Sequence, residues 1–219
     1  MGCAACRTAV AAAAAAVGIW AVAIAADPSQ KDRTPQVDAD QLRQAKMMED
    51  LMFGKGPIGG PFSLPDTGGS RRSLSEFRGK LVVLYFGYTS CPDVCPTDLA
   101  QIGAAIRDLR GDEARVQPIF ITLDPERDTA ALLGEYLANF HPRFIGLRGT
   151  TAEIRSVADR YKVYFKKVRG KEPGSYFVDH SPYVFLIGTK GEFLGSLPPG
   201  TTATRLEQAI RTSLSVVTQ

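Results

Sequence analysis

The sequence predicts an α/β fold, because short apolar runs alternate with stretches of helical periodicity along the chain. The run LVVLYFGY, which begins at Leu81, has the length and composition of a buried strand. Beyond Cys95, apolar residues recur on one helical face, and the run VQPIFITL then predicts a second buried strand. With 44% hydrophobic residues among 219, the chain has room for one well-buried core. We therefore expect a single domain with accessory segments.

The remaining elements continue this alternation. Apolar spacing predicts one helix over 133–140 and another over 154–161. The stretch YFVDHSPYVFLIG predicts a loop that runs into a strand, and EFLGSL predicts its hairpin partner across a turn at 189–191. A short helix is expected at 41–53, and a closing helix is predicted from the spacing of Ala203, Leu206, Ile210 and Leu214.

The first 26 residues differ from the rest of the chain and are not expected to belong to the fold. Arg7 is their only charge, and an uncharged run extends from Thr8 to Ala26. This run is alanine-rich, is close to the shortest length that spans a bilayer, and ends in small residues that resemble a signal-peptidase site. Residues 1–26 are therefore a signal peptide or an N-terminal membrane anchor. Under either alternative, the position of Arg7 predicts export of everything after Asp27.

A polar, proline-containing stretch without periodicity follows and predicts a flexible linker at 27–40. The domain itself is expected at 41–219. The formal charge of +3, with acidic and basic residues interleaved, gives no reason to expect a nucleic acid partner. One local basic run is interpreted as a solvated strand end and loop, and it comprises Lys162, Lys166, Lys167, Arg169 and Lys171.

Four cysteines form two closely spaced pairs. Cys3 and Cys6 precede the apolar run, where no packed scaffold holds their sulfurs, so we expect lipid attachment or no role for them. Cys91 and Cys95, in the stretch YTSCPDVCP, are the only cysteines of the predicted domain. Their spacing is compatible with a disulfide, a redox couple or a metal site. A disulfide that merely closed so short a loop would constrain the unfolded chain little.

The position of this second pair favours reactive or metal-binding sulfurs. The pair is expected at the carboxyl end of a central strand, with Cys95 as the N-cap of the next helix and Pro96 at its first position. Free N–H groups and the positive end of the helix dipole stabilise a thiolate over a thiol at that point.

Three stretches together resemble the Sco/SenC family, the copper proteins of cytochrome c oxidase assembly. They are YFGYTSCPDVCPTDL, ITLDPERDT and YFVDHSPYVFLIG, in that order, and the resemblance extends from about Phe62 to the C-terminus. It implies a thioredoxin-like fold, with a central mixed sheet flanked by helices, and an N-terminal anchor facing the intermembrane space or the periplasm. It also implies one copper ion bound by two cysteines and one histidine, which in this sequence are Cys91, Cys95 and His180.

The chemistry of these residue types agrees with copper. Thiolates suit Cu(I), and an imidazole suits both Cu(I) and Cu(II), so this ligand set can hold copper in either oxidation state. Three ligands leave an open side, from which the ligands of a recipient can attack the metal. Asp93 and Asp179 add negative field near a cation but are not expected to be ligands.

Two other polar features receive structural interpretations. His141, in NFHPRF, is expected to be a surface or capping residue. The LDPERDT segment is interpreted as a turn that leads into a helix, with Asp128 as the helix cap. The family resemblance marks this segment as typical without giving its residues a chemical role.

The predicted function is a copper metallochaperone that delivers copper to the dinuclear copper centre of cytochrome c oxidase subunit II. The alternative is a thiol-disulfide oxidoreductase, in which Cys91 and Cys95 are a redox-active pair that reduces the cysteines of that centre or of other exported proteins. Thioredoxin-type motifs use C-x-x-C, and the extra residue here makes room for a metal between the sulfurs. The two activities can coexist. A peroxidase is disfavoured, because Leu84 and Tyr88 stand where peroxiredoxin-like sites have proline and threonine.

The N-terminal segment also predicts where the protein works. Its apolar run begins after only a few residues, which favours a bacterial periplasm, with a tether to the inner membrane, over a mitochondrion. The expected partners are cytochrome c oxidase subunit II, the membrane, and a thiol reductase or another copper chaperone.

Overall fold

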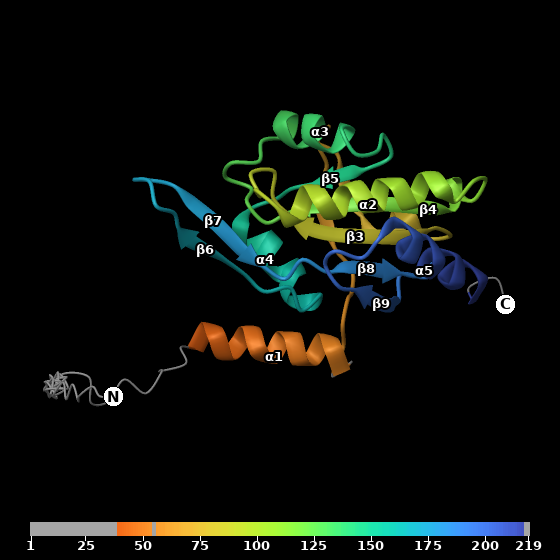
Figure 1. The fold of residues 1–219 in the computed structure, drawn as a ribbon, viewed down its shortest axis with the longest axis horizontal. Helices are drawn as coiled ribbons and strands as arrows, with labels where there is room; N and C mark the ends of the chain where they lie inside the picture. The colour runs from red at the N-terminus through yellow and green to blue at the C-terminus, as the bar shows by residue number, and fades with distance from the viewer. Residues whose placement is uncertain (1–38, 54–55, 217–219) are drawn as a thin grey trace, which may run out of the picture. The chain divides into compact units, whose positions relative to one another are not determined.

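Residues 39–53 and 56–216 are described in a computed structural model (Figure 1), and they belong to one compact unit. The predicted signal or anchor at 1–26, with Cys3 and Cys6, and the predicted linker up to residue 38 lie outside these residues. Within the described part of the chain, no helix has both the length and the apolar character needed to cross a membrane.

A central sheet of five strands organises the domain, in the order β5-β4-β3-β8-β9. The neighbours β3, β4 and β5 are parallel, whereas β8 and β9 pair in antiparallel fashion, so the sheet is mixed, as predicted. Every residue of β3 and β4 is buried, because helices cover both faces of these apolar strands. The strands are β3 at Leu81–Gly87, β4 at Val116–Thr122, β5 at Ile145–Leu147, β8 at Val184–Ile187 and β9 at Phe193–Leu197.

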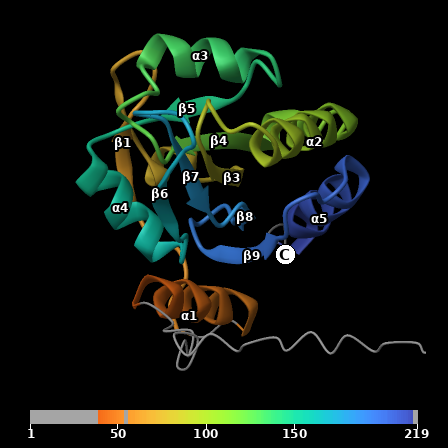
Figure 2. The ribbon, with the colours of Figure 1, turned by 60° about the vertical axis from the view of Figure 1, so that its left-hand side comes forward.

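Figure 2 shows α2 and α5 side by side on one face of the sheet, with α4 on the other face and α3 beyond β5. The predicted apolar stripe of α2 is fully buried. On the opposite face, the rings of Phe86, Tyr161 and Phe185 lie 5.7 to 5.8 Å apart and join the sheet to the end of α4. The helices are α1 at Ala39–Phe53, α2 at Val94–Asp108, α3 at Ala130–Ala138, α4 at Thr151–Arg160 and α5 at Ala203–Val216.

Two antiparallel hairpins lie outside the central sheet. The first pairs β1 at Ser63–Pro65 with β2 at Arg71–Ser73. The second pairs β6 at Phe165–Arg169 with β7 at Tyr176–His180, so the prediction of a loop at YFVDH is wrong. Four of the five β6 side chains are exposed, and a strand that faces solvent on both sides lacks the alternation by which a sequence reveals it.

The basic run lies on and around this second hairpin. Lys166 pairs with Asp40 at 2.5 Å and Lys167 pairs with Glu126 at 2.7 Å. Lys162 lies 3.5 Å from a buried carboxylate of α1, that of Asp50. These three lysines of the run therefore face carboxylates of their own chain, and each exposed pair contributes less than about 1 kcal/mol.

Thr129, rather than Asp128, caps α3. The Thr129 side chain accepts the N–H of Leu132, which satisfies one of the free donors of the first helical turn. The prediction of Asp128 as the cap is wrong, because its carboxylate is fully buried and points toward the loop that follows β3. The same pattern recurs in α4, where Thr150 and Glu153 form a capping box.

We predict that Gly103→Ala will lower the free energy of unfolding by about 1–3 kcal/mol, although alanine favours a helix more than glycine does. A Cβ at this position of α2 would lie 2.6 Å from the carbonyl oxygen of Phe140, a backbone atom that cannot move aside. Urea unfolding of the purified protein measures the change. Gly195→Ala is the control, since nothing lies within 4 Å of its added Cβ. Equal stability of the two variants would contradict this packing.

Candidate metal centre

The loop between β3 and α2 carries both predicted cysteines. The Cys91 N–H donates to the carbonyl of Tyr88 at 3.2 Å, which closes a tight turn before the helix begins. The helix starts at Val94 with Asp93 as its N-cap, so the predicted N-cap position of Cys95 is wrong by two residues. Pro96 still lies in the first helical turn, where a missing N–H costs nothing.

The Cys91 sulfur, rather than the Asp93 side chain, accepts a backbone hydrogen bond at the start of α2. The Asp93 side chain makes no capping hydrogen bond, whereas the Cys91 sulfur lies 3.5 Å from the backbone nitrogen of Cys95 and accepts its N–H. Negative charge on this sulfur is therefore stabilised by a helix N-terminus. Both thiols are free.

The two sulfurs differ in accessibility. Cys95 is completely buried, while Cys91 retains 9% of its surface. Cys95 packs so tightly against the last residue of β3 that a Cβ at Gly87 would lie 2.8 Å from its sulfur. Only glycine at this position leaves room for the sulfur. Because Cys95 is enclosed in this way, Cys91 is the sulfur that a partner molecule can reach.

The two thiols also differ in acidity. A hydrogen bond from the Cys95 thiol lowers the pKa of Cys91 to about 6, against the opposing effect of burial, and backbone N–H groups and the Tyr88 hydroxyl add to the shift. The same hydrogen bond and burial raise the pKa of Cys95. At neutral pH the pair therefore holds one proton, on Cys95, and one thiolate, on Cys91.

His180, the last residue of β7, faces the buried cysteine. Its Nδ1 lies 3.2 Å from the carbonyl oxygen of Val178, and because a carbonyl only accepts, Nδ1 carries the hydrogen. Burial lowers the pKa of His180, so the ring is neutral and Nε2 offers a lone pair. Nε2 lies 3.6 Å from the sulfur of Cys95. The Tyr88 ring contacts the imidazole edge to face at 5.8 Å.

These contacts link Cys95 to His180 on one side and to Cys91 on the other. A sulfur and a nitrogen bound to one tetrahedral zinc-sized ion are about 3.6 Å apart, so the spacing of Cys95 and His180 fits a shared metal. Even so, no three His, Cys, Asp or Glu side chains in the described part of the chain form a cluster that could hold a metal ion as it stands. The third donor, Cys91, lies on the open side of this pair.

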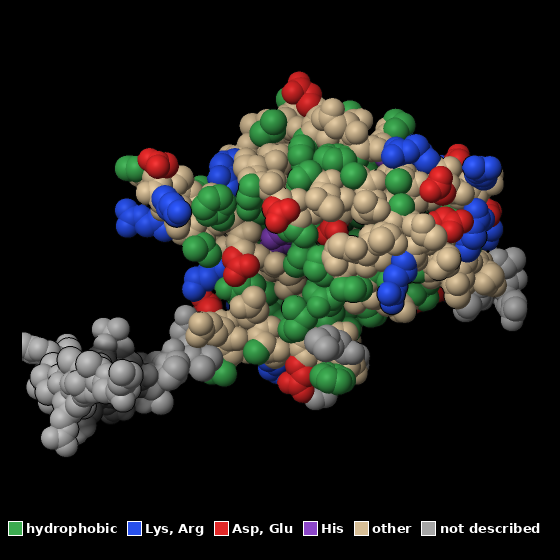
Figure 3. All heavy atoms as spheres, in the orientation of Figure 1, with side chains coloured by type: hydrophobic (Ala, Val, Ile, Leu, Met, Phe, Trp, Pro, Cys, Tyr) green, Lys and Arg blue, Asp and Glu red, His purple; other side chains and the backbone are tan. Residues whose placement is uncertain are grey.

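A cavity of about 450 Å³ opens beside Cys91 and His180. Figure 3 shows this face, where a histidine lies among apolar and acidic side chains. Asp93 and Asp179, predicted to add negative field, both line the cavity. Its outer wall is apolar, since Val168 and Phe177 are paired across the hairpin and nearly half exposed. The other lining residues are Tyr88, Pro92, Val94 and Val178.

Two tyrosines near the cysteines were not identified from the sequence. Burial raises the pKa of Tyr88 to about 12, and the Tyr88 hydroxyl in turn helps to lower the pKa of Cys91. Tyr85 lies beside Cys95 and donates to the buried carboxylate of Asp98 at 3.1 Å. Their positions in and just after an apolar strand that leads to the cysteines are the only signal that the sequence offers.

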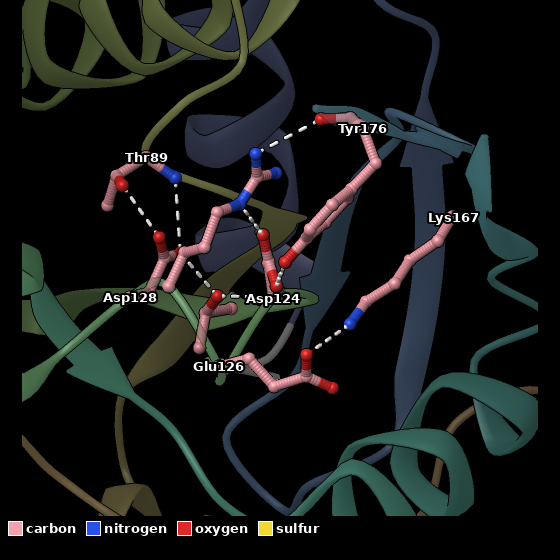
Figure 4. A network of polar contacts seen from close by, with 8 residues as sticks. Thr89, Asp124, Glu126, Asp128, Lys167 and Tyr176 are labelled. Atoms are coloured by element: carbon pink, nitrogen blue, oxygen red, sulfur yellow. Dashed lines mark hydrogen bonds and ion pairs between the residues drawn. The ribbon is translucent and has the colours of Figure 1, made fainter. Parts of the chain in front are cut away.

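The LDPERDT segment forms a polar network beside the site (Figure 4). Asp124 and Asp128 are both fully buried. Arg127 pairs with Asp124 and donates to the carbonyl of Tyr176 at 3.0 Å, while Asp128 accepts two hydrogen bonds from Thr89. Sequence reasoning gave these residues no chemical role, because their partners lie 39 and 49 residues away.

His141 is buried, so the prediction that it lies at the surface is wrong. It lies between α3 and β5, where its Nδ1 accepts the N–H of Arg143 at 3.2 Å. Its imidazole thus caps backbone in a loop, as the alternative interpretation expects.

The fold and the facing cysteine and histidine define a thioredoxin-like protein with a thiol and imidazole site. A family model described as SCO1/SenC matches residues 52–215, and the chain belongs to this family. It is 43% identical over 138 residues to a SCO2-like protein of Rickettsia felis, a match that covers 63% of this chain and 67% of the relative. It is also 43% identical over 147 residues to the mitochondrial protein SCO2 of Saccharomyces cerevisiae, covering 66% of this chain but only 49% of that protein.

Solved structures agree with this fold. ScoI of Arabidopsis thaliana, solved with copper bound, aligns with a TM-score of 0.68 at 39% identity and covers 73% of this chain and 99% of its own. Yeast Sco1 with copper bound aligns with a TM-score of 0.67 at 36% identity and covers 73% of this chain and 90% of its own.

We predict that Cys91 of the reduced, metal-free protein reacts with iodoacetamide at a rate that rises through about pH 6 and is level above about pH 7.5. The thiolate is the nucleophile, so a lowered pKa moves reactivity to lower pH. Cys95 stays unreactive, because it is buried and keeps its proton. Peptide mapping by mass spectrometry separates these thiols from Cys3 and Cys6. A midpoint near the ordinary value of about 8.5 would contradict the assigned hydrogen bonds.

Proposed function

We propose that this protein is a copper carrier that binds one copper ion through Cys91, Cys95 and His180. The observation that supports it most is the 3.6 Å separation between the Cys95 sulfur and Nε2 of His180, with Nδ1 already held by Val178. The carbonyl of Val178 fixes the tautomer that leaves Nε2 free for a metal. Copper in the structures of two relatives supports the choice of metal.

The residues present suit this cargo. Soft thiolates favour Cu(I), and the neutral imidazole serves both Cu(I) and Cu(II). Cys91 is already a thiolate at neutral pH, whereas Cys95 must lose its proton on binding. The cavity beside Cys91 gives the ligands of a recipient access to the cargo.

The recipient in this proposal is cytochrome c oxidase, and more narrowly the dinuclear copper centre of its subunit II. Membership of the family supports this choice, because a similar solved structure is described as a member of the Sco family of cytochrome c oxidase assembly proteins. The domain works outside the cytoplasm, in a bacterial periplasm, tethered to the inner membrane through residues 1–26. A thiol reductase supplies electrons to the cysteine pair, or a second copper chaperone supplies the metal.

A second function, thiol-disulfide exchange, is favoured by the acidity of the two thiols. One sulfur of low pKa that keeps some accessible surface, beside one fully buried sulfur of high pKa, is the arrangement of an attacking and a resolving cysteine. The Cys91 thiolate would attack a disulfide of an exported protein, and Cys95 would then release that protein as the Cys91–Cys95 disulfide forms. The carrier and the reductase use the same two sulfurs, but only the carrier needs His180 as a metal ligand. A variant of His180 therefore distinguishes the two functions.

We predict that the fully reduced protein binds one copper ion per chain and that the Cys91–Cys95 disulfide form binds none. Oxidation removes both thiolate ligands and leaves the imidazole alone. Metal analysis after desalting, combined with thiol counting, measures both states. Stoichiometric copper in the disulfide form would refute the proposed ligand set.

We predict that His180→Ala weakens copper binding by at least about 100-fold while the cysteines still form and exchange a disulfide, because the imidazole supplies a metal ligand but no sulfur chemistry. Cys91→Ser or Cys95→Ser should abolish both properties. His141→Asn is the matched control, since this histidine caps backbone away from the site. Competition against a Cu(I) chelator and titration with glutathione measure the two properties.

A strain that carries His180→Ala then separates the two functions in the cell. A carrier predicts loss of oxidase activity at low copper although the thiols still cycle. Normal oxidase activity in that strain, together with loss in the cysteine variants, would favour the reductase and reject the carrier.

A further inference from the structure

The candidate ligands come from two parts of the chain that no sheet ladder joins. Cys95 and His180 are separated by 85 residues, and among the described strands β7, which carries His180, pairs only with β6. The base of this hairpin is held by Arg155, which donates to the carbonyl of Phe165 at 3.0 Å and covers its ring at 3.6 Å. Phe165 is the cross-strand partner of His180. A hairpin held only at its base can turn about that point, so a second anchor is needed to fix its direction.

Asp128 anchors the cysteine loop. Its buried carboxylate accepts the N–H of Thr89 at 3.1 Å and the Thr89 hydroxyl at 2.6 Å. It also accepts the hydroxyl of Thr122, the last residue of β4, at 2.5 Å. Thr89 stands two residues before Cys91, so these bonds hold the cysteine loop against the end of β4.

Arg127, one residue earlier, anchors the hairpin. It pairs with the buried carboxylate of Asp124 and donates to the carbonyl of Tyr176 at 3.0 Å. The Tyr176 hydroxyl donates to the same carboxylate at 2.9 Å, and the guanidinium carbon lies 3.8 Å from the centre of its ring. Tyr176 begins β7, four residues before His180, and thus provides the second anchor point (Figure 4).

The guanidinium also faces the aromatic ring that joins cysteine and histidine. Its carbon lies 5.7 Å from the centre of the Tyr88 ring, and the centres of the Tyr88 and His180 rings are 5.8 Å apart. Tyr88 and Cys91 line the same cavity. The outer nitrogen of Arg127, Nη2, is buried without a hydrogen-bond partner among the described residues. A buried donor left unpaired costs about 1–3 kcal/mol, so this side chain is not placed where its own hydrogen bonding would be best.

We propose that Asp124, Arg127 and Asp128 are positioning residues that set the spacing of the cysteines and His180, and with it the copper affinity. They touch no metal themselves. Arg127 and Asp124 hold the histidine strand, Asp128 holds the cysteine loop, and all three belong to one short segment after β4. The proposal rests on the proposed copper site.

The test compares Arg127→Gln with Arg71→Gln. Arg71 is a matched control, because it also bonds a carboxylate, that of Glu153 at 3.0 Å, and a backbone carbonyl, that of Ser63 at 2.7 Å, but in the other hairpin. Competition against a Cu(I) chelator should show a loss of affinity of roughly 10- to 100-fold for Arg127→Gln, the range found when outer partners of metal ligands are removed. Arg71→Gln should bind as the parent does.

Two further readouts separate positioning from loss of stability. In the metal-free protein, the NMR contact between the Tyr88 and His180 rings should be lost in Arg127→Gln and retained in Arg71→Gln. The Cu(II)-thiolate absorption band should also shift in the first variant only. Parental affinity, band and ring contact in a folded Arg127→Gln would overturn the proposal.

Two more variants keep the test decisive. If Arg127→Gln does not fold, Tyr176→Phe takes its place, because it removes only the hydrogen bond from the Tyr176 hydroxyl to Asp124. The copper affinity of this variant should fall several-fold. Unchanged copper affinity together with an unchanged contact between the Tyr88 and His180 rings would overturn the proposal. Arg127→Lys keeps the charge but loses the planar fork, so it should not restore binding. If the parent protein binds no copper, the proposed function fails, while the ring contact in the metal-free variants still tests the positioning.

Discussion

The structure depends on the contact between a buried sulfur and an imidazole that arrives from a separate hairpin. Cys95 is fixed by its own helix and by the bare backbone of Gly87, which leaves its sulfur no room to retreat. His180 is fixed by the carbonyl of Val178 and by the ring of Tyr88. Each partner is therefore oriented before any ligand arrives, and a preoriented site loses less conformational entropy on binding. The sheet provides the rigid end from which the cysteine side of this contact is built.

The acidity of the thiols links the two proposed activities. Because the pair holds a single proton at neutral pH, Cys91 is a nucleophilic thiolate and Cys95 remains a protonated thiol. The same thiolate lies at the cavity with His180, where an entering metal would meet both. Disulfide formation removes both ligands together, so the redox state of the pair decides whether metal can bind. Under the proposal, one molecule cannot hold copper and the Cys91–Cys95 disulfide at the same time, although one protein could serve both activities in turn.

The sequence predicts those parts of the fold that depend on composition and near neighbours. The buried strands β3 and β4 and the apolar stripe of α2 follow from residue type and spacing, and all are confirmed. The strand β6 was missed because the alternation of a half-buried strand is absent from FKKVR. Asp128 was misassigned as a cap because Thr129 offers the same chemistry one residue later, and only the fold shows which side chain turns inward. The motifs named the three candidate ligands, but the roles of Tyr88 and Arg127 depend on contacts with β7, which local sequence does not reveal.

Placement of the histidine outside the central sheet would suit the proposed carrier, which has to release its metal. Separating a strand from the five-stranded sheet would break ladder hydrogen bonds and expose a fully buried surface, which costs a large part of the stability of a domain. Among the described strands, displacing the β6–β7 hairpin would break no ladder of the central sheet. It would cost the contacts of the two anchors, the Lys167–Glu126 ion pair and the packing of Phe165 and Val178. One anchor is Arg127, which lies between the rings of Tyr88 and Tyr176. Its Nη2 has no hydrogen-bond partner among the described residues, so the hydrogen bonding of this anchor is incomplete. In the proposed carrier, movement of His180 would therefore break side-chain contacts and leave the ladders of the central sheet in place.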